Sequence, residues 1–411
     1  MKSPKIFYGY VVIAAAFLIL VVMGASIYSF GVFLKPMAEE FGWTRALTSG
    51  AQSMNMLVLG LFFIVTGRLT DRIGPRIVVT VGGLFFGLGY FLTSNIENAW
   101  QLYLFYGVAV SLGISCGFVP MLSIIPRWFT KRRGLMTGIV VSGVGAGTMV
   151  GPPLSSWLIS NHGWRDSYTI LGLTGMALLI LFGQFLKRDP GKIGQLPHGQ
   201  SEVKQDASNR EATGFSIRKA IQTRQFWLIF TMYIFFLTSE MAVMVHIVPH
   251  VTDQGISPMI AANMVTVIGG ASLIGRVVFG GIGDRIGNKA ALIIGLVLLA
   301  GSLFWLPSAK ELWVLSIAIG IFGFSSGGLI TLQSPVVAEL FGLRSLGAIL
   351  GVLLLGNHAG CALGPVMAGY IYDVTLSYQL AFLIFAALTA ICIILVLPLH
   401  PTHQKDLTGN T

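Results

Sequence analysis

The chain has 411 residues, of which 54% are hydrophobic and only 10% carry a charge. A soluble domain has roughly 25% charged residues to keep its surface hydrated, so this composition excludes a cytosolic enzyme, a secreted disulfide scaffold and a disordered chain. A net charge of +10 is compatible with nucleic-acid binding, but the placement of the basic residues favours a membrane topology instead.

Twelve apolar stretches are long enough to cross a membrane, which takes about 20 residues each. They lie at 10–34, 46–69, 76–95, 101–126, 134–160, 167–186, 226–251, 260–282, 290–307, 312–337, 346–371 and 379–399. One long polar segment, 187–225, contains prolines and mixed charges and is expected to be a cytoplasmic linker. We therefore expect an all-α membrane protein with 12 transmembrane helices in two six-helix halves, 1–186 and 226–411.

The basic residues predict how these spans are oriented. If both termini are cytoplasmic, the inner segments contain 21 of the 26 Lys and Arg residues, the outer loops contain four, and Arg276 lies within a span. Membrane proteins retain Lys and Arg on the cytoplasmic side. We expect both termini to be cytoplasmic, with basic residues near membrane lipids and no nucleic-acid partner.

An internal repeat relates the two halves. The segment GRLTDRIG at 67–74 returns as GGIGDRIG at 280–287, and the same shift of 213 residues maps Gly147 onto Gly360 and Gly151 onto Gly364. Such agreement between distant spans indicates a duplicated six-helix unit. Repeated bundles that enclose a site near the middle of the membrane are typical of transporters that work by alternating access.

The acidic and basic residues of the repeated loop are candidates for conformational gating. Each Asp can accept hydrogen bonds from the N-terminus of a facing helix when the cytoplasmic side is closed. The gating candidates are Asp71, Arg72, Asp284 and Arg285.

The loop sequence GRLTDRIGPR at 67–76 resembles the signature of the major facilitator superfamily, and the resemblance covers essentially the whole chain. The segment 127–135, which leads into Gly138, resembles the entry to span 5 of monocarboxylate transporters. Gln225-Phe226-Trp227 and Gly275-Arg276 are similar to the oxalate–formate antiporter group. The resemblance implies proton-coupled carriage of small monocarboxylates, such as lactate or pyruvate, across a bacterial cytoplasmic (inner) membrane.

Arg276 is the strongest candidate for binding the substrate. It lies eight residues before Asp284, about 12 Å along a helix, and a guanidinium at such depth is tolerated only beside an anion or a wet cavity. Its fork suits a carboxylate, and the resemblance implies this role. A buried ion pair with Glu240 is the alternative. Ser272 stands where monocarboxylate transporters carry an Asp, so the proton role of that Asp does not transfer.

Five other residues are candidates for the transport site. Glu240, a carboxylate deep in a span, is a candidate proton carrier or a structural partner of Arg276, and Asp253 is a weaker proton candidate. Asn357 and His358 lie near the middle of span 11, where an amide and a titratable imidazole could bind substrate or only join helices. By resemblance, Tyr28 occupies the position of a functional lysine in monocarboxylate transporters.

These features predict a secondary transporter of small monocarboxylates that works by proton-coupled alternating access. Carboxylate antiport of the oxalate–formate type is the main alternative, and drug efflux or a receptor role on the same fold are others. The chain lacks HExxH, GxSxG and P-loop motifs, so it is not expected to be an enzyme. Its cysteines, Cys116, Cys361 and Cys392, lack metal-ligand spacing, and we expect no cofactor. The oligomeric state stays open.

Overall fold

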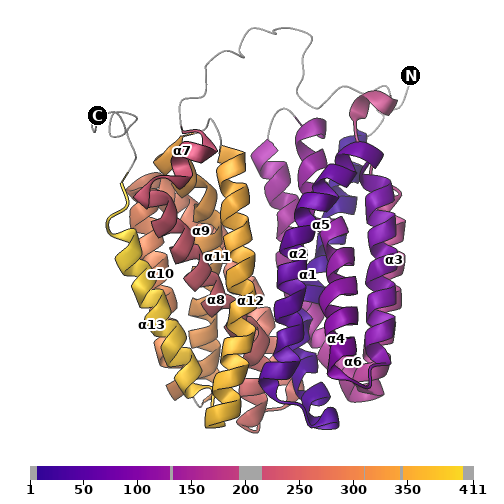
Figure 1. The fold of residues 1–411 in the computed structure, drawn as a ribbon, viewed down its shortest axis with the longest axis vertical. Coiled ribbons are helices and arrows are strands. Elements are labelled where there is room, and N and C mark those ends of the chain that lie inside the picture. The colour runs from indigo at the N-terminus through magenta and orange to yellow at the C-terminus, as the bar shows by residue number, and fades with distance from the viewer. Residues whose placement is uncertain (1–6, 130–132, 194–214, 310, 343–345, 401–411) are drawn as a thin grey trace. The chain divides into compact units, whose positions relative to one another are not determined.

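The computed structural model describes residues 7–129, 133–193, 215–309, 311–342 and 346–400. The regular elements within these residues are all helices, as Figure 1 shows. They are α1 (Tyr8–Phe41), α2 (Arg45–Ile73), α3 (Pro75–Ser94), α4 (Ala99–Leu102), the π-helical η1 (Tyr103–Val110), α5 (Ser111–Trp128), α6 (Arg133–Gly183), η2 (Pro190–Ile193), α7 (Ile217–Ile221), α8 (Arg224–Asp253), α9 (Pro258–Ile286), α10 (Asn288–Trp305), η3 (Leu306–Ser308), α11 (Leu312–Phe341), α12 (Leu346–Thr375) and α13 (Gln379–Val396).

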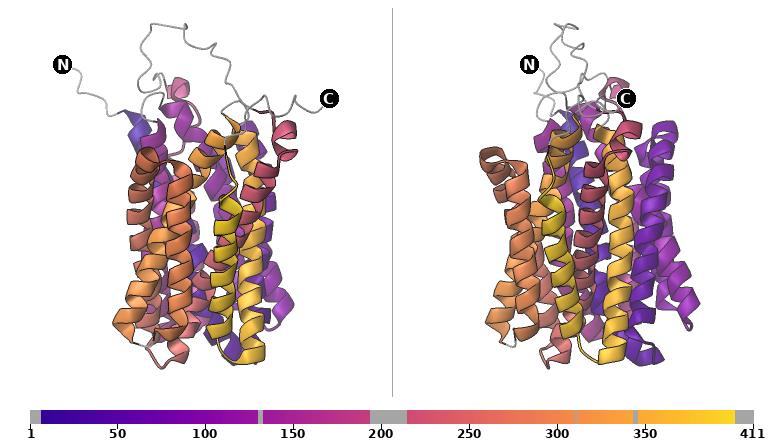
Figure 2. Two further views of the ribbon diagram at one scale, coloured as in Figure 1. Left: turned by 90° about the vertical axis from the view of Figure 1, so that its left-hand side faces the viewer. Right: turned by 60° about the vertical axis from the view of Figure 1, so that its left-hand side comes forward.

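The helices form two compact units, each of which is a bundle of long helices packed side by side (Figures 1 and 2). Unit 1 comprises Met1–Gln205 and Ile256–Thr266, and unit 2 comprises Asp206–Gly255 and Val267–Thr411. Most of the linker predicted for 187–225 lies outside the described residues. The domain boundaries predicted at 186 and 226 therefore stay a prediction.

Eleven helices within the described residues are long and apolar enough to cross a membrane. One of them, Met136–Gly183, is interrupted at Gly163, which has φ 76° and ψ 167°. Glycine adopts such a positive φ without steric penalty, so the chain turns there and α6 consists of two membrane-crossing segments. The spans predicted at 134–160 and 167–186 are these two segments, and the all-α membrane fold is confirmed.

The repeated loop signature ends on a glycine in both units. Gly74 (φ 87°) and Gly287 (φ 90°) each end one helix and begin the next, since α3 starts at Pro75 and α10 starts at Asn288. Their backbone N–H groups donate to the carbonyl oxygens of Thr70 and Gly283, both at 3.0 Å. A side chain at either glycine would be strained because L-residues rarely adopt this φ, which explains why both copies of the loop keep it.

Glycines also set the closest helix contacts, and they do so at equivalent positions in both units. In unit 1, a Cβ on Gly147 would collide with the carbonyl oxygen of Val21 on α1. In unit 2, a Cβ on Gly360 would lie 2.5 Å from the carbonyl oxygen of Ile234 on α8. Both residues of the second pair are shifted by 213 from the first. The repeat found in the sequence is therefore also a repeat of backbone-to-backbone contacts.

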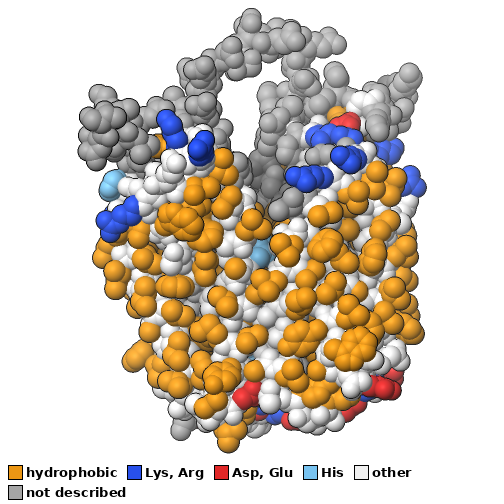
Figure 3. Space-filling model, in the orientation of Figure 1, with side chains coloured by type: hydrophobic (Ala, Val, Ile, Leu, Met, Phe, Trp, Pro, Cys, Tyr) orange, Lys and Arg blue, Asp and Glu red, His pale blue; other side chains and the backbone are white. Residues whose placement is uncertain are grey.

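The surface of each unit has an apolar belt between its two ends (Figure 3). Large apolar side chains such as Leu61, Val277, Phe304 and Ile394 are more than 60% exposed. A soluble protein does not expose apolar patches of this extent, whereas lipid tails solvate them. The belt is therefore the lipid-facing surface of a multi-pass membrane protein.

Candidate functional site

Unit 2 holds a carboxylate in the buried part of a membrane-spanning helix. Glu240 lies in the middle of α8, where every residue from Phe236 to Val251 is buried, and its own exposed fraction is 6%. The hydroxyl of Ser326 on α11 donates a hydrogen bond of 3.0 Å to Glu240 Oε1. A buried carboxylate without a partner would be strongly destabilising, so this bond from α11 is what makes its position tolerable.

Arg276 approaches this carboxylate from a third helix. Glycines bring α9 against α11, because a Cβ on Gly327 would collide with the backbone of Ser272, one turn before Arg276. Arg276 is half-buried and close enough to Glu240 for their charges to interact. Among the described residues, however, the two side chains do not form an ion pair within the 4.0 Å limit, and Arg276 Nε is buried without a hydrogen-bond partner. The guanidinium therefore retains the capacity to bind an anion.

A pair of amides lies on the two neighbouring helices. Asn357 Nδ2 on α12 donates to Gln333 Oε1 on α11 at 3.3 Å. The remaining atoms, Asn357 Oδ1 and Gln333 Nε2, are buried and have no partner in the described part of the chain. Turning both amides over would exchange the roles of the two groups but would again leave one donor and one acceptor. The pair therefore offers both to a ligand.

Cys361 connects the amide pair with the charged pair. It lies one helical turn after Asn357 on α12, and residues four apart share a helix face. It is also near enough to Glu240 for an electrostatic interaction. Four residues correspond to about 6 Å along the helix axis, so Cys361 lies between Asn357 on its own helix and Glu240 on α8.

The structure places the other candidates as follows. His358 is half-buried on α12, and its Nδ1 donates to the carbonyl oxygen of Leu354 at 2.8 Å. Asp253 lies 13 residues after Glu240 on α8, about 20 Å along the axis, where it lines a separate cavity of about 390 Å³ with His250 and Tyr378. Tyr28 is half-buried on α1 of unit 1. Asp253 is therefore not part of the Arg276 region.

The gating candidates lie at the ends of α2 and α9. The side chains of Arg72 and Arg285 are exposed there. The side chains of Asp71 and Asp284 are outside the described part of the structure, so their predicted gating contacts stay a prediction.

Sequence reasoning missed two kinds of polar residue. Gln333 and Ser326 belong to the unit 2 site, and the amide of Gln333 within an apolar span was an available signal. In unit 1, Asn55 on α2 donates at 2.9 Å to the carbonyl oxygen of Tyr106 in the π-helical segment, and Tyr106 donates at 2.7 Å to Gln52. Nothing in the sequence marks a π-helix, so this contact could not be predicted.

The described residues contain no group of three or more His, Cys, Asp or Glu side chains that could hold a metal ion. The polar groups of the candidate site, on α8, α9, α11 and α12 of unit 2, are one guanidinium, one carboxylate, two amides and a hydroxyl. Such a set is suited to binding a small anion that also carries a neutral polar group, and to holding a proton beside it.

Comparison with known proteins agrees with this organisation. Residues 16–278 and 229–411 match the model of the Major Facilitator Superfamily. Monocarboxylate transporter 13 of Rattus norvegicus is 28% identical over 392 residues, which cover 94% of this chain and 87% of the relative. The uncharacterized MFS-type transporter YhjX of Escherichia coli is 29% identical over 340 residues, covering 82% of this chain and 81% of its own. The crystal structure of a bacterial homologue of the human lysosomal transporter Spinster, in its occupied form, matches with a TM-score of 0.73 at 16% identity and covers 96% of this chain and 97% of that one.

Proposed function

This chain belongs to the major facilitator superfamily, so it is a membrane transporter rather than an enzyme, and we propose that it carries a small monocarboxylate of the lactate or pyruvate kind together with a proton. The observation that carries the proposal is the buried Nε of Arg276, in the middle of a span, which has no hydrogen-bond partner among the described residues. A single fixed cation matches a single carboxylate, because the guanidinium group of an arginine can donate two parallel hydrogen bonds to the two carboxylate oxygens. The names of the relatives in rat and mouse, monocarboxylate transporters 13 and 12, support the same class of substrate.

In this proposal the substrate carboxylate binds Arg276, and Glu240 holds the proton. A negative substrate beside Arg276 weakens the attraction between the guanidinium and the Glu240 carboxylate, which favours protonation of Glu240. Anion and proton then occupy the site together, and the loaded site has little net charge to move across the membrane. Asn357 and His358 would contact the rest of the substrate from α12. The predicted substrate role of Tyr28, on α1 of unit 1, stays a prediction.

The carriage of one proton with each anion predicts that a pH gradient drives uptake. Purified protein in liposomes should accumulate radiolabelled lactate when the side from which lactate enters is more acidic, and accumulation should stop when a protonophore collapses the gradient. An uptake rate that does not depend on the pH gradient would contradict proton symport.

The role of Arg276 is tested by replacing it in the same liposomes. Arg276→Gln should reduce lactate uptake at least 100-fold, because breaking a desolvated charge-assisted contact costs about 3 kcal/mol or more. Arg276→Lys keeps the charge but loses the fork, and should retain a small, measurable rate. Unfolding temperatures of both variants within a few degrees of the parent chain would show that the fold is intact. Normal uptake by Arg276→Gln would remove this residue from the site.

Carboxylate antiport of the oxalate–formate type is the alternative, and it would require the imidazole of His358, next to Asn357, to supply a second cation for a dicarboxylate. Antiport predicts that oxalate or formate preloaded inside the liposomes accelerates uptake of the labelled acid from outside. Symport predicts proton-driven uptake into liposomes that contain no carboxylate, whereas obligatory antiport predicts none.

A further inference from the structure

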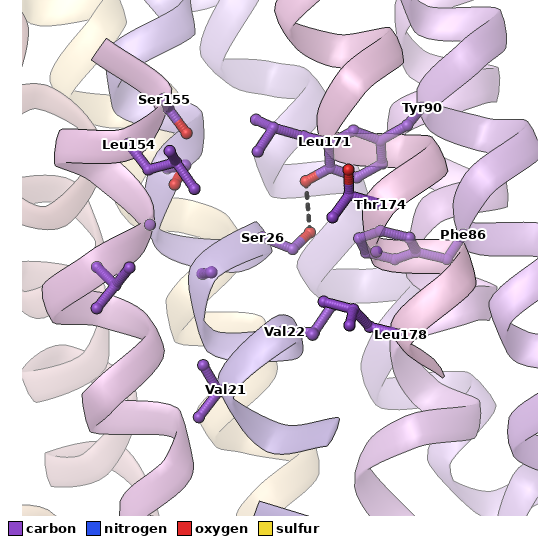
Figure 4. A pocket seen from close by; sticks show the side chains of 15 residues that line it. Val21, Val22, Ser26, Phe86, Tyr90, Leu154, Ser155, Leu171, Thr174 and Leu178 are labelled. Carbon is purple, nitrogen blue, oxygen red and sulfur yellow. Dashed lines mark hydrogen bonds between the residues drawn. The ribbon is translucent and has the colours of Figure 1, made fainter. Parts of the chain in front are cut away.

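A cavity of about 220 Å³ lies within unit 1, between α1, α3 and the two segments of α6 (Figure 4). None of the 15 residues that line it is charged, and most are aliphatic or aromatic, as Val22, Phe86 and Leu178 illustrate. An apolar cavity of about 150 Å³ in another protein stays dry and binds benzene. This cavity is therefore large enough for a substituted ring or a short alkyl chain.

Two hydroxyl groups in the cavity lack a partner. Ser29 Oγ on α1 and Ser155 Oγ on α6 belong to side chains that are 4% and 0% exposed, and neither atom has a hydrogen bond within the described residues. Thr148 and Ser160, on the same helix as Ser155, donate to carbonyl oxygens one turn earlier. A buried hydroxyl without a partner is destabilising by about 1–3 kcal/mol. A ligand that forms hydrogen bonds with these two hydroxyls would remove this cost.

Two more hydroxyl groups, which bond to each other, lie in the same cavity. Ser26 Oγ and Tyr90 OH are 2.6 Å apart. Figure 4 shows the oxygens of Ser26, Tyr90 and Ser155 facing the space between the helices. The cavity is thus an apolar volume with hydroxyls on its walls, and a ligand that fits it has an apolar body and one hydrogen-bonding oxygen.

Two of the residues that line the cavity reach the surface of unit 1. Val150 and Leu154, which line it, are 57% and 43% exposed. Val150 lies halfway along the first segment of α6, which runs from Met136 to Gly163. Hydrocarbon surrounds that depth and supplies no water, so the occupant reaches the cavity from the lipid phase.

The cavity is not required by the fold. The shift of 213 residues maps Ser155 onto Ala368, Ser29 onto Ala242 and Tyr90 onto Leu303. Unit 2 builds the equivalent helix packing without these hydroxyl groups. The hydroxyls of Ser29, Ser155 and Tyr90 are therefore particular to unit 1, whereas Ser26 maps onto Ser239.

We propose that this cavity is a binding site for an uncharged hydrophobe that partitions into the bilayer and carries one hydroxyl group. The hydroxyl of the ligand bonds to Ser29 and Ser155, and its apolar body fills the remaining volume. The lack of charged groups excludes a carboxylate, because an unpaired charge is not tolerated in such a cavity. The site is thus distinct from that of the transported acid and does not depend on the proposed function.

The test compares 4-fluorophenol with 4-fluorotoluene, which have the same shape but differ in the hydroxyl. Both are titrated into the purified full-length chain in one detergent, and binding is followed by fluorine NMR. We expect 4-fluorophenol to bind about fivefold tighter after correction for partition into the micelles, as one hydrogen bond implies. Equal affinities would indicate a slot for plain alkyl chains and would overturn the proposal, as would the absence of binding.

Variants locate the binding. Ser29→Ala/Ser155→Ala should reduce the preference for the phenol to within about twofold and leave the affinity for 4-fluorotoluene unchanged. Val22→Phe, which fills the cavity, should abolish binding of both compounds. Ser160→Ala is the matched control, since it removes a hydroxyl that bonds within its own helix. A preference that survives in the double variant, or that disappears equally in Ser160→Ala, would also overturn the proposal.

Discussion

Glu240 and Arg276 are stabilised differently, although both lie in the middle of membrane spans. Glu240 is almost completely buried and accepts a hydrogen bond from Ser326. Arg276 is half-buried and has a buried nitrogen without a partner in the described residues. A polar group that is satisfied by the protein itself suits a resident proton site, whereas an unsatisfied one suits a ligand that comes and goes.

The first prediction at this scale concerns Glu240. Glu240→Gln keeps the size of the side chain and the acceptor for Ser326, but an amide has no titratable proton. We therefore expect exchange of labelled lactate for unlabelled lactate to continue, while net uptake driven by a pH gradient falls at least tenfold. A pH-sensitive dye inside liposomes measures the accompanying proton flux. Ser325→Ala is the control, since the hydroxyl of Ser325 bonds within its own helix, and should keep proton coupling. If the liposome interior still became acidic at the parent rate in the Glu240→Gln variant, another residue would have to carry the proton.

The second prediction concerns Gln333 and Asn357, whose spare atoms are one donor and one acceptor. A 2-hydroxyl can satisfy both, a 2-oxo group only the donor, and an unsubstituted acid neither. Each bond is worth about 0.5–1.5 kcal/mol, or about two- to twelve-fold in affinity. We therefore expect the KM for uptake to increase from lactate to pyruvate to propionate.

The double variant Gln333→Leu/Asn357→Leu tests this order. It should bring the three KM values within about twofold of one another, with the carboxylate still bound by Arg276. An unchanged order in the double variant would show that other residues recognise the 2-position.

Single polar residues are predictable from this sequence only where they stand out. Arg276, Glu240 and Asn357 were recognisable because each interrupts an apolar run. Ser326 was not, since serines are frequent in membrane helices and satisfy themselves on their own helix, as Ser325 does by donating to Ile321. Only the glycine-mediated approach of α9 to α11 brings Ser326 and Arg276 to one region, and that approach is a property of the fold.

At the scale of elements, the stability of each unit depends on glycines that allow two helix backbones to touch. Gly360 packs on Ile234, and its counterpart Gly147 packs on Val21. Not every glycine in these helices has this role. Gly138 on α6 and Gly351 on α12 have open space where a Cβ would be.

This contrast yields a prediction with a matched control. Gly360→Ala should lower the free energy of unfolding by about 1–3 kcal/mol, because the added methyl group forces the backbones of α8 and α12 apart. Gly351→Ala should leave it unchanged or raise it by up to about 1 kcal/mol, since alanine is the better helix former. Thermal unfolding of the purified variants measures both. If both variants lost the same free energy of unfolding, the close packing of α8 and α12 would not depend on Gly360.

Helices themselves were largely predictable, but their irregularities were not. Hydrophobic length locates the membrane spans because every backbone polar group in lipid must be satisfied within a helix. The same rule says nothing about the π-helical turns at Tyr103–Val110, where the side chain of Asn55 bonds to a backbone carbonyl. Such a segment depends on a partner from another helix, and that partner is visible only in three dimensions.

At the scale of the whole molecule, composition and spacing were enough to predict the fold. The low fraction of charged residues predicts a membrane protein, and the shift of 213 residues predicts its duplication. The orientation in the membrane rests on the uneven distribution of 26 basic residues and stays a prediction. It can be tested independently of transport.

Labelling of introduced cysteines tests the orientation of each unit. Glu97→Cys and Glu311→Cys replace exposed residues that lie just before α4 and α11, and an impermeant maleimide should label both on intact cells. Ile73→Cys and Leu397→Cys replace side chains that are 45% and 56% exposed at the opposite helix ends, and should react only after the cells are permeabilised. The parent chain with its own cysteines is the control for background. If only Ile73→Cys and Leu397→Cys were labelled on intact cells, the topology would be the opposite of the predicted one, and the excess of Lys and Arg would face outward.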